Sequence, residues 1–288
     1  MGINSNVMKK LLSILFLFIL GLPVSGQQSP GVIRIASYNL RMDTPTDGIN
    51  SWKYRKENVK SLIRYHDFDI MGTQEGFSHQ LHDLLELKNY TYFGAGRDDG
   101  KEAGEHSAIF YKKARFKKLD SGNFWLSETP ENPGKGWDAT CCNRICSWVK
   151  LKDKNNNTVF YVFNVHFDHR GIIARKESGK LMVEKIKSIA GDMPVICTGD
   201  FNSTPDTEQI QRMRSLLQDT FSATVTPPYG PIGTANAFRF DAPLKKRIDY
   251  VFVSKDFNVS KYAVLTDYKE QRYPSDHLPV VAYITLSR

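Results

Sequence analysis

The sequence predicts an α/β fold: a four-layer α/β sandwich in which two mixed β-sheets pack face to face with helices outside. Strand–helix–strand order occurs twice along the chain, and each time more β-rich sequence follows. That order suits two related halves, each contributing one sheet and its covering helices. No linker or low-complexity segment interrupts residues 27–288, and about 260 residues can bury the core of one large domain. We therefore predict a single domain over 27–288.

The first 26 residues are predicted to be a cleaved signal peptide. Lys9 and Lys10 precede the uncharged apolar run 11–20, and small residues follow at 23–26. This order is typical of secretory signals. A membrane anchor is the alternative, but the apolar run is shorter than the roughly 20 residues that span a bilayer. We expect a secreted or periplasmic protein that is not inserted in the membrane after cleavage.

The first half of the mature chain predicts two strands, two helices and then a β-rich region. Val59, Leu62 and Ile63 recur at helical spacing, whereas the flanking runs are continuously apolar and end in polar residues. The expected elements are strand 32–41, helix 52–66, strand 69–75, helix 77–87, several strands within 90–151, and a hairpin turn at 153–157.

The second half repeats this order. Apolar runs that end in polar residues again alternate with helical patterns, and three further strands complete the chain. The expected elements are strand 158–168, helix 174–190, strand 194–202, helix 206–217, and strands 247–254, 262–268 and 278–286.

The four cysteines give limited information. A zinc site is not supported for Cys141, Cys142 and Cys146, because no His or Cys partner follows at zinc-finger spacing. Export permits disulfides, and either a Cys142–Cys146 or a Cys141–Cys146 bridge is possible. Cys197 lies inside an apolar run and is expected to be a small core residue.

The formal net charge of +8 is compatible with an anionic substrate but does not identify one. The basic run 112–118 is expected to be a solvated hairpin, although phosphate attraction is the alternative. Aromatic residues in polar stretches, which could stack on bases or belong to the core, are Trp125, Trp137, Phe238 and Tyr273.

Acidic, amide or imidazole side chains stand at one end of nearly every predicted strand. They are Asn39, Glu75, His166, Asp168, Asp200, Asn202, Asp249, Asp276 and His277. If these ends converge, the buried charges would be costly without a cation. Carboxylate oxygens suit a hard cation, so Mg²⁺ is expected, with Mn²⁺ possible. Mg²⁺ held by few carboxylates fits phosphoryl chemistry better than a closed structural site.

The motifs SYNLR, TQE, NVHFDH, TGDFN, RIDY and SDH occur in this order. Together they resemble the endonuclease/exonuclease/phosphatase superfamily of metal-dependent hydrolases, from about Val32 to Leu286. Two further stretches, DGINSWKYRKENV and PGKGWDATCCNRICSW, resemble the secreted bacterial branch near the deadenylase-type exonucleases.

The resemblance implies a role for each matching residue. Glu75 would be the principal metal ligand, with Asn39 beside it and Asp276 completing the metal surroundings. Asp200 would lie near the attacking water, and Asn202 would help to hold the phosphate. His277 would act as general base or stabilise the pentavalent state, and Asp249 would orient its ring. His166 would contact a phosphoryl oxygen or the leaving group.

Three further residues are expected to contact the substrate: Tyr111, Arg144 and Asp168. Family members often place a tyrosine and an arginine near the phosphate, and the arginine fork suits phosphate oxygens.

The resemblance predicts a divalent-metal-dependent phosphoesterase that uses in-line attack by water. The first hypothesis for the substrate is a phosphodiester in nucleic acid. The alternative is a phosphomonoester or a phospholipid, inositol or sugar-phosphate headgroup. A catalytically silent binding module is disfavoured, because every expected acidic and imidazole position is filled. A long basic groove with exposed aromatic residues would indicate a polymer, and a small pocket with converging arginines a headgroup. No obligate protein partner is evident.

Overall fold

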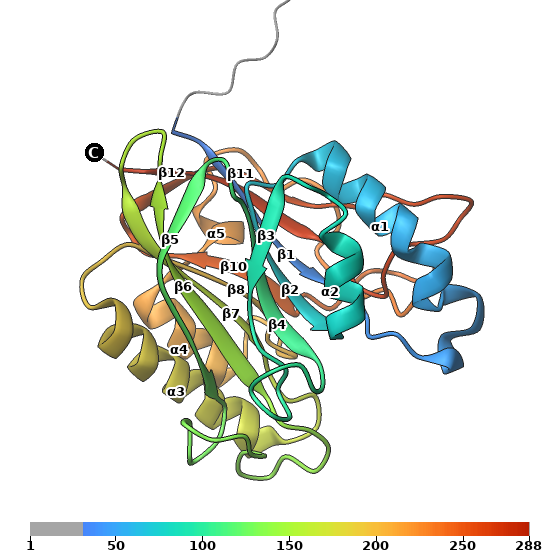
Figure 1. The fold of residues 1–288 in the computed structure, drawn as a ribbon, viewed down its shortest axis with the longest axis horizontal. Coiled ribbons are helices and arrows are strands. Elements are labelled where there is room, and N and C mark those ends of the chain that lie inside the picture. Colours follow the sequence, from blue (N-terminus) through green and yellow to red (C-terminus); the bar gives the residue numbers. More distant parts are fainter. Residues whose placement is uncertain (1–30, 288) are drawn as a thin grey trace, which may run out of the picture.

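The computed structural model describes residues 31–287, so the predicted signal peptide lies outside the described residues. Two six-stranded sheets pack face to face, and the helices lie outside them (Figure 1). This confirms the predicted four-layer sandwich. The helices are η1 (Pro45–Asn50), α1 (Trp52–His66), α2 (Ser78–Leu84), α3 (Ile172–Ala190), α4 (Glu208–Leu216) and α5 (Thr220–Ala223).

The first sheet has the strand order β11-β12-β1-β2-β4-β3. Its strands are β1 (Ile33–Asn39), β2 (Ile70–Gly76), β3 (Tyr90–Phe93), β4 (His106–Lys112), β11 (Phe257–Val264) and β12 (Val280–Leu286). β1 and β2 are parallel, and α1 lies between them in sequence, whereas the other pairs are antiparallel.

The second sheet has the order β5-β6-β7-β8-β10-β9. Its strands are β5 (Phe116–Trp125), β6 (Ile145–Asp153), β7 (Val159–His166), β8 (Val195–Asp200), β9 (Gln218–Asp219) and β10 (Asp249–Val253). Here β7 and β8 form the parallel pair, and α3 connects them. Each sheet is thus built around one strand–helix–strand unit.

Among the hydrophobic clusters of residues 31–287, three large ones hold the four layers together. The central core lies between the sheets and includes Ile35, Ile70, Val162 and Ile196. A second core packs the first sheet against α1 and α2, and a third packs the second sheet against α3 and α4. Figure 1 shows these two pairs of helices on opposite sides of the sheets.

Asn164 of β7 connects the two sheets through their core. Its amide nitrogen donates to the carbonyls of Thr73 and Ala108 at 2.8 and 3.0 Å. Its oxygen accepts hydrogen bonds from the Gln74 amide at 2.7 Å and from the Thr198 hydroxyl at 2.9 Å. A buried amide is tolerated when its donors and acceptors are satisfied. These hydrogen bonds connect β2 and β7, which lie in different sheets, just before their functional ends.

The structure changes several predicted boundaries. β11 begins at Phe257 and ends at Val264, whereas a strand over 262–268 was expected. Phe257, Val259, Tyr262 and Val264 pack into the central core, so the pairing with β12 ends before Asp267. The short elements η1, β9 and α5 lie in segments whose sequence predicts no regular structure. Within residues 31–287, no helix is both long and apolar enough to cross a membrane.

Candidate active site

The strand order gathers the predicted site residues at one edge of the sandwich. Asn39 and Glu75 lie at the carboxyl ends of the parallel strands β1 and β2. His166 lies opposite Asp200 at the same ends of β7 and β8. β10 pairs with β8 in the antiparallel direction, which places Asp249 opposite Asp200.

Asn39 links the carboxylates of the two sheets. Its amide nitrogen donates to Glu75 Oε1 at 2.9 Å and to Asp200 Oδ2 at 3.0 Å. Its own oxygen accepts the Arg41 backbone N–H. Asn39 thus positions the two carboxylates beside each other, and its place next to the metal ligand Glu75 stays a prediction.

Glu75 is a charged carboxylate. Burial raises the pKa of its carboxyl, but the charges of His277 and Arg41 and hydrogen bonds from Asn39 and Met42 outweigh burial and hold that pKa below its usual value. For Asp200, burial together with the charge of Asp249 raises the pKa to about 7.

His277 and Asp249 form a hydrogen-bonded pair. His277 Nδ1 lies 2.8 Å from Asp249 Oδ2, which also accepts from the Thr234 hydroxyl at 2.5 Å. Burial lowers the pKa of His277, yet the charges of Asp249 and Asp200 raise it well above its usual value. The pairing fixes the ring and leaves Nε2 for a ligand in the cavity.

His166 is held in one tautomer by Arg144. An Arg144 Nη donates to His166 Nδ1 at 3.0 Å, so the ring proton lies on Nε2. Burial and the charges of Arg144 and Arg97 lower the pKa of His166 well below its usual value, which keeps the ring neutral. His166 Nε2–H is therefore a donor suited to a phosphoryl oxygen.

Three residues at this edge have backbone conformations that side chains other than glycine rarely adopt. Arg41 has φ 55°, Glu75 φ 65° and Asn202 φ 45°. Such conformations cost about 1–3 kcal/mol each and cluster at functional sites. Glu75 lies where the β2–β4 register shifts, between Thr73 and Gly76. The bulge turns the Glu75 side chain out of the strand's regular alternation.

The donor set fits a divalent cation. Glu75, His166 and Asp200 each offer a ligand atom, and these atoms lie within 4.8 Å of one another. Because His166 Nδ1 accepts from Arg144 and Nε2 carries the proton, neither ring nitrogen is free to bind a metal. The ligands of this group are therefore the carboxylates of Glu75 and Asp200. Burial and the charge of Glu75 raise the pKa of Asp276. Glu75, Asp200 and Asp276 are thus close enough to repel one another, and a cation would relieve that repulsion.

A cavity of about 380 Å³ opens onto these groups. Sequence reasoning had predicted six of its lining residues, namely Glu75, Arg144, His166, Asp200, Asn202 and His277. The other lining residues are Arg41, Met42, Glu105, Cys141, Cys142, His169 and Arg170. The signal for Arg41 is its place at the end of SYNLR, and the signal for Glu105 is its place just before β4. Burial raises the pKa of Glu105 to about 7, opposed by Arg97.

Three predicted residues lie elsewhere or act indirectly. Tyr111 pairs with Ile70 at the opposite end of β2 from Glu75 and packs in the central core, so its expected substrate contact is wrong. The Asp168 carboxylate accepts the backbone N–H groups of Arg170 and Gly171 and shapes the turn before α3. Asp276 does not line the cavity, and its Oδ2 lies 3.8 Å from Arg41 Nε.

The expected cysteine pairing is also wrong. A disulfide joins the neighbouring residues Cys141 and Cys142, whereas Cys146 and Cys197 are free and buried. Cys146 lies in β6 with its side chain in the core beneath α3, out of reach of the preceding loop. Cys197 is a core residue, as predicted.

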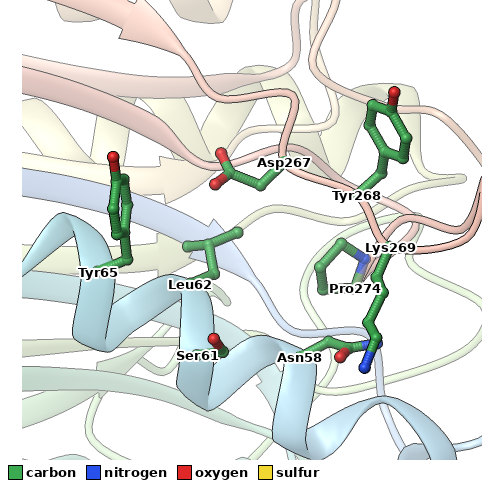
Figure 2. Close-up of a pocket in the computed structure, with 8 residues that line it drawn as sticks. All are labelled: Asn58, Ser61, Leu62, Tyr65, Asp267, Tyr268, Lys269 and Pro274. Atoms are coloured by element: carbon green, nitrogen blue, oxygen red, sulfur yellow. The ribbon is translucent and has the colours of Figure 1, made fainter.

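A separate hollow lies between α1 and the segment that follows β11 (Figure 2). Tyr65 and Leu62 line it from the helix, and Asp267 and Tyr268 from the opposite segment. Its volume of about 520 Å³ exceeds that of the cavity at the strand ends, but none of the predicted site residues lines it. The chemistry of the side chains, rather than volume, identifies the candidate active site.

Comparisons with known proteins agree with this geometry. The family described as "Endonuclease/Exonuclease/phosphatase family" matches residues 36–277. A Bacteroides thetaiotaomicron protein of that family is 43% identical, with a TM-score of 0.85 over 89% of this chain and 98% of that one. A mannosyl-6-phosphatase from the same species is 42% identical, with a TM-score of 0.83 over 88% of this chain and all of that one.

A more distant relative is the Ccr4 3'-5'-exoribonuclease subunit of the CCR4-Not complex from Kluyveromyces lactis. It is 23% identical over 83% of this chain, which spans only 38% of the length of Ccr4. The ordered motifs, the strand-end carboxylates and the family match lead to one conclusion. The chain belongs to the endonuclease/exonuclease/phosphatase family and is a metal-dependent hydrolase of phosphoric ester bonds.

Proposed function

We propose that the chain is a Mg²⁺-dependent phosphomonoesterase that acts on a small phosphorylated sugar. The observation that carries this proposal is the cavity of about 380 Å³, which Arg41, Arg144 and Arg170 line beside the catalytic groups. A small pocket with converging arginines is the arrangement that indicates a headgroup rather than a polymer.

Charge supports a monoester. A phosphomonoester carries about −1.5 to −2 charges near neutral pH, whereas a diester carries one. Arg144 lies in the cavity wall with only 4% of its surface exposed. It holds His166 and also donates to His169 Nδ1 at 2.8 Å, so its positive charge is fixed beside the phosphate position.

The features that suggested nucleic acid lie away from the cavity. Lys112 begins the basic run at the end of β4 far from Glu75 and pairs with Asp67 and Asp69. Among the four aromatic candidates, all within the described residues, none lines the cavity. Two of them, Trp125 and Tyr273, are buried. These positions support the headgroup alternative over the first substrate hypothesis.

The mannosyl-6-phosphatase supports the same choice. Its identity of 42% over its whole length is nearly twice the 23% of the exoribonuclease subunit. Function can differ on a shared fold, so the similarity supports the proposal only together with the shape and charge of the site.

The chain's own residues supply most of the proposed chemistry. The Asn202 amide nitrogen donates to the Phe167 carbonyl and lies 3.2 Å from His166 Nε2, so these two groups would face the phosphoryl oxygens together. Asp249 holds the His277 ring so that Nε2 faces the same group. Asp200, fixed by hydrogen bonds from Asn39 and Asn202, accepts the proton of the attacking water. A Mg²⁺ ion held chiefly by Glu75 would neutralise negative charge on the phosphoryl oxygens and would leave Asp200 to take the proton of the water.

A hydrolysis panel with Mg²⁺ tests the proposal. We expect kcat/KM for mannose 6-phosphate or glucose 6-phosphate to exceed that for bis-(p-nitrophenyl) phosphate and single-stranded RNA by at least about a hundredfold. Chelation with EDTA should abolish all of these activities. Faster hydrolysis of RNA than of either sugar phosphate would replace the proposal with a nuclease.

A further inference from the structure

The disulfide between Cys141 and Cys142 forms part of the wall of the catalytic cavity. Both residues line it together with Glu75, His166 and Asp200. Cys141 is exposed and Cys142 is partly exposed. The other two cysteines are buried in the core and free. Within residues 31–287, the sulfur-containing side chains that line the cavity are this pair and Met42.

The loop that carries the pair is fixed at several points. Asp138 accepts the backbone N–H groups of Ile173 and Ala174 at 3.1 and 2.7 Å, which attaches the loop to the start of α3. The Asn143 amide donates to the Arg97 carbonyl at 3.3 Å. Arg144 follows directly and contacts both His166 and His169. These hydrogen bonds hold the loop in place, so its conformation does not depend on the disulfide alone.

The pair differs chemically from the rest of the wall. Among the lining residues, which all belong to the described part of the chain, only Met42, Cys141 and Cys142 carry no charged, amide or imidazole group. Thioether and disulfide sulfur are polarizable and weakly hydrated, and they pack well against carbon. A disulfide has no S–H group and cannot rotate as two thiols can.

A phosphorylated sugar presents two different ends to such a cavity. The phosphate needs donors and cations, which Arg144, His166 and Asn202 supply. The sugar ring has a face of C–H groups, which gains from contact with an apolar wall. If the phosphate lies against these charged residues, the wall formed by Met42, Cys141 and Cys142 is the apolar surface left for the ring.

We propose that the Cys141–Cys142 disulfide, with Met42, forms the subsite that holds the carbon skeleton of the leaving alcohol. The pair determines specificity and takes no part in the chemical step. This inference rests on the proposed function, since it assigns the sugar part of that substrate. The expected export of the chain would place the pair in an oxidising compartment, where disulfides persist.

The test compares two phosphomonoesters, one with a sugar ring and one without. The kcat/KM of the Mg²⁺-loaded protein is measured for mannose 6-phosphate and for glycerol 2-phosphate, before and after reduction with a phosphine. The same measurements are made on the double variant Cys141→Ala/Cys142→Ala. Intact mass after alkylation counts the free thiols in each sample, and thermal melting checks that the variant is folded.

We expect the ratio of the two kcat/KM values to fall about tenfold on reduction and in the double variant, the usual size of one lost apolar contact. The phosphine should not change the ratio of the double variant, because its remaining cysteines are free. If reduction only displaced Arg144, hydrolysis of both esters would slow equally and the ratio of the two kcat/KM values would not change.

Failure of this inference differs from failure of the proposed function. If unreduced protein hydrolyses both esters and the ratio stays within about twofold on reduction, the subsite is refuted and the phosphatase stands. Four free thiols in the unreduced protein would likewise refute the subsite. If unreduced protein hydrolyses neither ester, the proposed function fails, and the subsite fails with it.

Discussion

Replacing Glu75 with glutamine is expected to lower kcat/KM by about a thousandfold while the protein stays folded. Stabilisation of transition-state charge by a bound cation is worth several kcal/mol, and each 1.4 kcal/mol corresponds to a factor of ten. Glutamine keeps the size of the side chain and can still meet Asn39, but it removes the charge that holds the cation. Steady-state hydrolysis at saturating Mg²⁺ measures the loss.

Glu208→Gln is the matched control, because the Glu208 side chain is 45% exposed at the start of α4 and does not line the cavity. Its activity should stay within about twofold of the unmodified protein, since surface changes of this kind seldom exceed 0.5 kcal/mol. Far-UV circular dichroism should be unchanged in both variants. Full activity of Glu75→Gln would show that the principal metal ligand lies elsewhere.

His277→Ala and Asp249→Asn should each lower kcat by about 10²–10⁴-fold, the range of a positioned acid–base group. Asp249 acts through His277, so the double variant should be no slower than His277→Ala alone. KM should change little, because the pair supports the reacting state rather than binding. Full kinetics on the two single variants and the double variant measure this coupling.

His66→Ala controls for the loss of a histidine–aspartate pair as such. His66 Nε2 lies 2.9 Å from Asp267 Oδ1, and Asp267 lines the separate hollow of Figure 2. Neither residue lines the catalytic cavity. Its kcat should equal that of the unmodified protein. Additive losses in the Asp249–His277 cycle would mean that Asp249 works independently of the ring.

The layers and the convergence of the strand ends could be predicted from the sequence. Polar residues such as Asn39, Glu75 and Asp200 each end an apolar run, and the carboxyl ends of parallel strands meet at one edge of a sheet. The ordered motifs then indicated which of these strand ends form the active site.

Other features depend on geometry that a sequence does not state. Tyr111 was misplaced because a strand pattern shows which face a residue occupies but not which end faces the site. The positive φ of Glu75 arises from a bulge in the β2–β4 pairing, which depends on the partner strand. The pairing of Cys141 with Cys142 could not be chosen from spacing alone.

The size of the cavity changed the substrate hypothesis. The basic run 112–118, expected to be a solvated hairpin with phosphate attraction as the alternative, ends β4 and begins β5 at the far side of the sheets. The arginines that do reach the site come from three separate segments: the loops after β1 and β7, and the loop before β6. Their convergence appears only in three dimensions.

A crystal structure of the protein with Mn²⁺, recorded at the manganese absorption edge, tests the central claim most directly. The account predicts an anomalous peak in the cavity lined by Arg144 and His166, about 2.1–2.2 Å from a carboxylate oxygen of Glu75. The peak should be absent in Glu75→Gln under the same conditions. A peak that avoids Glu75 and Asp200, or one that persists unchanged in Glu75→Gln, would contradict the assignment of this edge as the metal-dependent active site.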